Sequence, residues 1–113
     1  NTASISLLSV HDDAGLKHVR KHFPKGTIED FLHDLSAKEL KSSKKKLDKS
    51  SLDHEVIIKT GHVASEIVKT AKSGQFDLIV MGAKGRSTFT DLLIGSVAQR
   101  VLSATLVPVT LIK

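Results

Sequence analysis

The 113-residue sequence contains no cysteine, tryptophan or tyrosine, and only two prolines. The lack of cysteine excludes disulfides, zinc–thiolate sites and cysteine nucleophiles, and fits a cytoplasmic location. Four phenylalanines are the whole aromatic content, so there are few rings on which unstacked RNA bases could stack. No apolar run approaches the roughly 18 residues of a membrane span, and no signal-peptide pattern opens the chain. We therefore expect a cytoplasmic protein with no membrane partner.

The positive charge is concentrated in one stretch of a chain whose formal net charge is +5. That stretch contains Lys38, Lys41, Lys44, Lys45, Lys46 and Lys49, opposed only by Glu39 and Asp48. A positive balance favours anionic partners in general. We interpret the lysines as the solvated face of a helix, and a nucleic-acid patch is the alternative that we consider less favoured.

Short apolar runs alternate with segments of helical periodicity along the chain. The predicted strands are 5–10, 55–59, 76–81 and 107–112, and the predicted helices start at 27, near 63 and near 95. The third run is apolar at successive positions, which is typical of a strand covered on both faces. Strands that alternate with helices predict an α/β fold, an open, doubly wound, mostly parallel sheet with helices on both faces.

Three details of these elements can be checked against a structure. Thr27 is a plausible N-cap of the first long helix, whose expected buried face carries Ile28, Phe31, Leu32 and Leu35. Gly74 is the expected end of the second helix. Pro108 cannot donate to a ladder, so the last strand is expected at a sheet edge.

Ligands of such sheets bind outside the carboxyl ends of the strands, and the turn after Met81 is the most informative of these places. Gly82 and Gly85 allow the backbone to turn tightly, and Lys84 brings positive charge to the same turn. Gly95-Ser96 then opens a helix, whose free N–H groups and dipole favour an anion. Together these features predict a site for a di- or triphosphate, although each glycine taken alone is explained more simply as a loop or cap residue.

The segment G-A-K-G-R-S-T-F-T-D-L-L-I-G-S (82–96) resembles the ATP-binding signature of the universal stress proteins, Gly-x2-Gly-x9-Gly-Ser/Thr. The flanking D-L-I-V-M-G and V-P-V-T-L-I-K agree with it. The likeness is strong over Glu55–Lys113 and loose before that. It implies an adenine nucleotide alpha hydrolase-like, Rossmann-like fold. It also implies a regulatory protein that holds ATP, or AMP or cyclic AMP, with Mg²⁺ as a possible companion.

The family's site residues can be carried over by position. The nucleotide-binding residues so implied are Val10, Gly82, Lys84, Gly85, Gly95, Ser96 and Val97. Family members typically pair as homodimers through the last strand, which here is Val107–Lys113. The family also opens with a strand that carries an Asp, and this chain starts at what resembles the family's second strand. We therefore expect residues 1–113 to form a single domain of this family that is incomplete at its N-terminus, or whose sheet is rearranged.

Several other functions are less well supported. His18 and His22 are four residues apart and could share a helix face as metal ligands, but a solvated loop accounts for them more simply. The P-loop, the dinucleotide fingerprint and the nucleophile elbow are absent from the sequence. No general base is identifiable, so any ATPase activity should be slow. The alternatives to an ATP-binding regulator are a dimeric interaction module that does not bind ATP and, more weakly, a nucleic-acid-binding protein.

Overall fold

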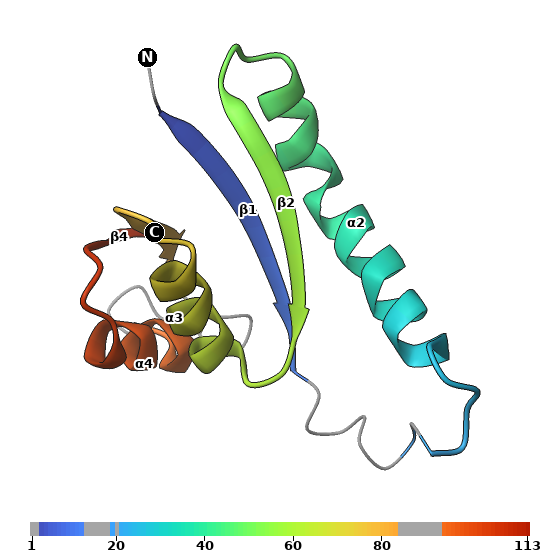
Figure 1. Cartoon of the computed structure of the whole chain (residues 1–113). Coiled ribbons are helices and arrows are strands. Elements are labelled where there is room, and N and C mark those ends of the chain that lie inside the picture. Colours follow the sequence, from blue (N-terminus) through green and yellow to red (C-terminus); the bar gives the residue numbers. More distant parts are fainter. Residues whose placement is uncertain (1–2, 13–18, 20, 84–93) are drawn as a thin grey trace. The chain divides into compact units, whose positions relative to one another are not determined.

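The computed structural model describes residues 3–12, 19, 21–83 and 94–113 (Figure 1). Its elements, in order, are β1 (Ser4–His11), α2 (Thr27–Asp48), β2 (Asp53–Thr60), α3 (Val63–Ser73), β3 (Ile79–Gly82), α4 (Ser96–Ala104) and β4 (Val109–Ile112). This order confirms the predicted α/β alternation. The chain forms two compact units, Asn1–His62 and Val63–Lys113. None of the helices in the described ranges is long and apolar enough to cross a membrane.

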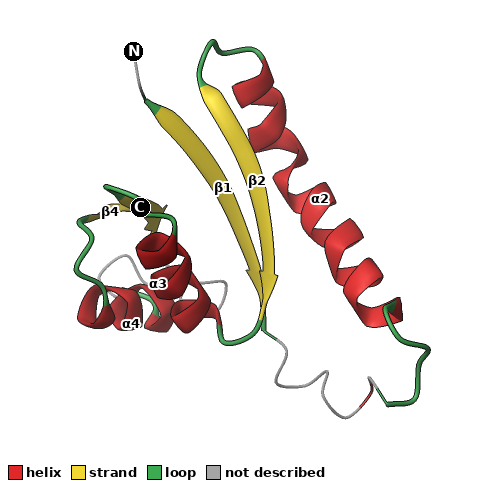
Figure 2. Cartoon of the chain, viewed as in Figure 1, coloured by secondary structure: helices red, strands yellow, loops and turns green. Residues whose placement is uncertain are grey.

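Each unit contains one pair of parallel strands (Figure 2). In the first unit β1 pairs with β2 along their full length, and the ladder continues one step further where the Gly61 N–H donates to the His11 carbonyl at 2.9 Å. In the second unit β3 pairs with β4 from Ile79–Val109 to Gly82–Ile112. The parallel direction confirms the prediction. Over the described residues the four strands form two two-stranded sheets.

The start of α2 corrects one expectation. Its N-cap is Gly26, not Thr27, and Thr27 is the first residue of the helix. Gly26 lies in the left-handed region at φ 90°, which glycine adopts without a Cβ penalty. Its carbonyl accepts the first helical hydrogen bond, from the Asp30 N–H at 2.9 Å. The chain therefore enters the helix through backbone geometry and without a side-chain cap.

The buried face of α2 also differs from the expected one. Leu32 and Ser36 are buried, whereas Phe31 is 59% exposed and Leu35 is 37% exposed. The buried stripe follows i, i+4 spacing, which keeps one line of residues against the β1–β2 sheet along which α2 lies (Figure 1). A serine is stable at this position because its hydroxyl accepts a hydrogen bond from Ser9 of β1 at 3.2 Å.

Small residues form the core of the second unit. Ala64 and Ala71 of α3 and Ala98 and Val101 of α4 are buried, so the two helices pack closely. The exposure of β3 alternates along the strand, with Ile79 half-buried, whereas we expected cover on both faces. Val80 is 62% exposed, because its face of the β3–β4 pair carries no cover in the described chain.

The predicted stop at Gly74 is confirmed, with one difference in conformation. The Phe76 N–H bonds to the Ala71 carbonyl at 3.0 Å, and the Gln75 N–H bonds to the Lys72 carbonyl at 3.2 Å. These two bonds form a Schellman motif. Its left-handed residue is Gln75, at φ 55°, and not the glycine. Gly74 is required for space, because a Cβ there would overlap the ring of Phe76.

Pro108 lies just outside the last strand, which starts at Val109. Its carbonyl accepts a hydrogen bond from the Ile79 N–H at 2.9 Å, so it joins the ladder as an acceptor only. This is the one ladder role that a residue without an N–H can fill.

Candidate functional site

Ala83 joins the carboxyl end of β3 to the start of α4 through its backbone hydrogen bonds. The Ala83 N–H donates to the Ile112 carbonyl of β4 at 2.8 Å, and the Ala83 carbonyl accepts from the Gly95 N–H at 2.7 Å. Ala83 is itself buried. Backbone hydrogen bonds therefore hold Gly82 and the cap of α4 at one place.

The first turn of α4 presents N–H groups that donate no hydrogen bond to any described residue. Gly95 caps the helix at φ −62° and ψ 158°, and its carbonyl takes the first helical bond, from Gln99 at 3.0 Å. The three N–H groups before that bond belong to Ser96, Val97 and Ala98, and a helix offers them no internal acceptor. The first turn carries no acidic side chain. It therefore combines open donors with the positive end of the helix dipole.

Two side chains shape the entrance to this turn. The Gln99 side chain donates from Nε2 to the Ile94 carbonyl at 2.7 Å, which fixes the residue just before the cap. Gly95 is buried while Ser96 is exposed, so the Ser96 hydroxyl is accessible to a ligand. An anion that reaches the turn would meet backbone donors and a hydroxyl, which is the donor set that binds phosphate in proteins.

Comparison with known proteins assigns the chain to a family. The model of the universal stress protein family matches residues 1–113. The chain is a member of the universal stress protein family. Solved structures agree: the chain is similar to MJ0577, with a TM-score of 0.86 and 27% identity over 100% of this chain and 77% of that chain. It is also similar to PH0823, with a TM-score of 0.76 and 25% identity over 98% of this chain and 76% of that one.

Curated relatives have the same family name. Universal stress protein YxiE of Bacillus subtilis is 28% identical over 98% of this chain and 80% of its own length. Universal stress protein MJ0577 of Methanocaldococcus jannaschii is 30% identical over 77% of this chain and 58% of its own length. Universal stress protein Slr1230 of Synechocystis is 37% identical over 62% of this chain. The matched part is 24% of Slr1230, so the chain spans only a fraction of that relative.

This universal stress protein brings some of the predicted site residues together. Gly82, Gly95, Ser96 and Val97 all lie at the carboxyl end of the β3–β4 pair, around Ala83. The predicted residues Lys84 and Gly85 lie outside the described residues. Val10 belongs to the first unit, where it is half-buried in β1 and pairs in register with Lys59 of β2.

Ala83 and Ala98 contribute to the site and were not predicted. Both act through backbone atoms, Ala83 as the tie between β3 and the cap and Ala98 as the third open N–H. A small residue directly after a glycine at a strand end was the available signal, because close approach of backbones requires a small side chain. Every helix start leaves its first N–H groups without an internal acceptor, so the Ala98 N–H could have been expected from the predicted start of the helix alone.

The metal site considered for His18 and His22 gains no support. His22 is exposed, and His18 lies outside the described residues. No group of three His, Cys, Asp or Glu side chains that could hold a metal occurs in the part of the chain that the structure describes.

Proposed function

We propose that this universal stress protein holds ATP, or the related AMP or cyclic AMP, and acts as a nucleotide-dependent regulator in a stress response. The observation that carries the proposal is the hydrogen bond from the Gly95 N–H to the Ala83 carbonyl. It holds a glycine-ended strand and an open helix start at one place, which is the arrangement that phosphate groups require. Membership of the family supports the same ligand class.

The phosphates are proposed to lie on the first turn of α4. Ser96, Val97 and Ala98 would donate backbone N–H groups, and each charge-assisted hydrogen bond contributes about 1.5–3 kcal/mol. Gly82 would let the ligand approach the strand end closely. By resemblance to the family, Lys84 and Gly85 would wrap the phosphates and ribose. In the same way, Val10 would contact adenine.

Hydrolysis is proposed to be slow or absent. The first turn of α4 has no acidic residue, and neither Gly95 nor Ser96 can act as a general base toward water. If the nucleotide is bound without being hydrolysed, the occupancy of the site follows the nucleotide concentration, which suits a regulator. Mg²⁺ would arrive with the nucleotide as its phosphate counter-ion.

Equilibrium dialysis of the purified chain against labelled ATP with Mg²⁺, competed by AMP and cyclic AMP, tests the proposal. Saturable binding at one site per chain is expected. Gly95→Leu, which fills the buried cap, should abolish binding. Ala104→Leu makes the same kind of change at the exposed far end of α4 and should leave binding intact. Equal binding by both variants, with circular dichroism unchanged, would refute the assigned site.

We also propose that the chain forms a homodimer through Val107–Lys113. Because Pro108 and Ile112 direct their carbonyls to β3, the alternating residues Val109 and Leu111 direct theirs to the opposite edge. No strand occupies that edge in the described chain. Leu106 beside it is fully exposed, as apolar residues at contact surfaces often are in an isolated chain.

Light scattering after size-exclusion chromatography tests the dimer. The wild-type chain should show twice the monomer mass, and Leu106→Lys should lower that mass toward the monomer. Leu102→Lys, at a position of α4 that is 43% exposed, is the matched control. A wild-type mass of one chain would contradict the dimer and would leave the nucleotide proposal unaffected.

A further inference from the structure

A stripe of lysines covers the outer face of α2. Its members, Lys38, Lys41, Lys45 and Lys49, follow one another at intervals of three, four and four residues. This spacing places them on one side of a helix. All four are exposed, and they lie opposite the buried face that contains Leu32 and Ser36. We call these four residues the lysine stripe.

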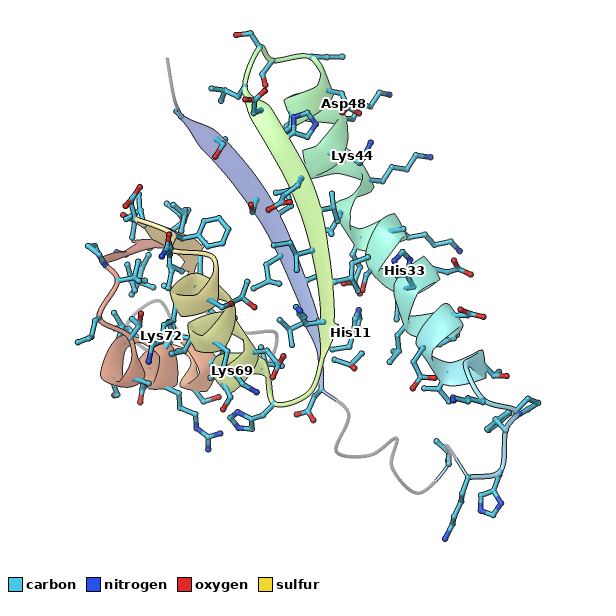
Figure 3. The ribbon with its side chains drawn as sticks, viewed as in Figure 1. His11, His33, Lys44, Asp48, Lys69 and Lys72 are labelled. Carbon is cyan, nitrogen blue, oxygen red and sulfur yellow. The ribbon has the colours of Figure 1, made fainter. Side chains whose placement is uncertain are left out.

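Asp48, the carboxylate beside the C-terminal end of the stripe, is already occupied, whereas Asp34 lies four residues before Lys38 at its other end. Asp48 Oδ1 lies 2.9 Å from His54 Nε2, and Asp48 Oδ2 lies 3.4 Å from Lys44 Nζ (Figure 3). Glu39, the other acidic residue of this half of the helix, has Oε2 3.8 Å from Nε2 of the half-buried His11. In the described chain no ion pair neutralises a member of the stripe. Its positive charge is therefore available to an anionic partner.

The distribution of apolar residues argues against a lipid surface. Membrane-bound basic helices combine lysines with apolar side chains that enter the bilayer. The exposed Phe31 and Leu35 lie instead in the first half of α2. Residues 38–49 expose no large apolar side chain. All side chains of the stripe are charged and exposed to solvent, which suits binding to a phosphate backbone.

The dimensions of the stripe fit duplex DNA. At 1.5 Å per residue, the rise from Lys38 to Lys49 is about 16 Å. The major groove of B-form DNA is about 12 Å wide and admits a helix, whereas the major groove of A-form RNA is too deep and narrow to be read. Lysines at the two ends of the stripe can therefore reach phosphates on both strands. Lysine binds phosphate as a point charge, and the stripe holds no arginine, asparagine or glutamine to read bases.

We propose that the lysine stripe of α2 binds the phosphate backbone of duplex DNA without sequence preference. The lack of tyrosine and tryptophan agrees with a duplex partner, because single strands are held largely by stacking on aromatic rings. The stripe lies in the unit Asn1–His62, and the first turn of α4 lies in Val63–Lys113. The stripe and the first turn of α4 share no residue, so each can be altered without changing the other.

Fluorescence anisotropy of the full chain with a labelled DNA duplex of about 20 base pairs tests the proposal. Four contacts predict a slope of about −3.6 in log K against log salt, so affinity should fall about a hundred-fold between about 50 and 200 mM salt. Replacing all four stripe lysines by glutamine should weaken binding at about 50 mM salt by at least about a hundred-fold. The matched control replaces Lys21, Lys25, Lys59 and Lys72, which are also exposed, and should stay within a few-fold of wild type.

Each other outcome overturns the proposal. Equal losses in the two quadruple variants would show that only net charge acts, because both variants lose the same four charges. Binding to vesicles of anionic lipid but not to DNA at the same salt would identify a membrane surface. Preference for single-stranded DNA or for duplex RNA would contradict the groove geometry. The Gly95→Leu variant should bind DNA as wild type does, and a parallel loss of DNA and ATP would place both ligands at one site.

Discussion

The hydroxyl of Ser9 in β1 donates a hydrogen bond to the hydroxyl of Ser36 in α2, 3.2 Å away, at a buried position. Ser36 has no exposed surface and is among the most deeply buried side chains of the described chain. Each hydroxyl is the hydrogen-bond partner of the other between β1 and α2. Removing one leaves the other buried and unsatisfied, whereas removing both leaves two apolar surfaces in contact.

A double-mutant cycle tests this relationship. Ser36→Ala and Ser9→Ala should each lower the free energy of unfolding by about 1–3 kcal/mol. The double variant should lose less than the sum of the two, with a coupling energy of about 1 kcal/mol. Urea unfolding gives these values, and Ser42→Ala at an exposed position of α2 is the control. Additive losses would mean that the two hydroxyls do not interact.

Gln75 should gain stability when it is replaced by glycine. It adopts φ 55° in the motif that ends α3, where a side chain is strained and glycine is not. We expect Gln75→Gly to raise the free energy of unfolding by about 1 kcal/mol. Ser73→Gly, inside the last turn of α3, should lower it by about 1 kcal/mol. Thermal unfolding of the two variants measures the direction of each change in stability. A loss of stability in both variants would show that Gln75 is not strained.

The pair of Asp48 and His54 should make stability depend on pH. The hydrogen bonds from the His54 ring to the Leu52 carbonyl and to Asp48 raise the pKa of His54 above its ordinary value of 6.5. Protonated His54 lowers the pKa of Asp48 below 3.8. The stabilising contribution of His54 is therefore complete below about pH 6.5 and is lost as the pH rises through the higher folded value. That of Asp48 is present above 3.8 and is lost as the pH falls through its lower folded value.

Comparison of wild type with His54→Gln, by urea unfolding at about pH 5 and about pH 8, checks this window. The stability difference between the two proteins should be larger at the lower pH, because glutamine cannot become charged. His33→Gln, at an exposed position of α2, is the matched control (Figure 3). A difference that grows with pH would contradict the direction of the His54 pKa shift.

Ser96→Pro separates a backbone donor from a side-chain donor at the proposed phosphate site. Proline is well accepted as the first residue of a helix, and Gly95 already has the extended conformation that a residue before proline prefers. The variant should therefore fold, but it lacks both the N–H and the hydroxyl. We expect ATP binding to weaken about tenfold or more, since one charge-assisted bond is worth about 1.5–3 kcal/mol. Ser96→Ala should weaken it less, because the N–H remains.

The sequence predicted the order of the elements well, because strand and helix periods are local properties. It placed the buried face of α2 only partly right, because Leu32 is buried as expected but Phe31 and Leu35 are exposed. Phe31 and Leu35 satisfy the helical period, but the line that meets the sheet runs through Ser36, whose burial depends on a hydroxyl 27 positions earlier in the chain. No local pattern contains that partner. The cap at Gly26 was missed for a related reason, because a left-handed φ is a property of the backbone that a preference for Ser or Thr does not reveal.

The hydrogen bonds of Ala83 to Ile112 and Gly95 involve no side-chain atom. Gly82, Ala83 and Gly95 contribute through main-chain atoms, and none of them has a side chain beyond Cβ. A scan that replaces residues by alanine would pass over Ala83 unchanged and would retain every N–H and carbonyl at the other two positions. Chemical exchange of a single amide for an ester removes one donor and keeps the shape of the chain. Such backbone editing can measure the contributions of Gly82, Ala83 and Gly95, which alanine substitution leaves unchanged.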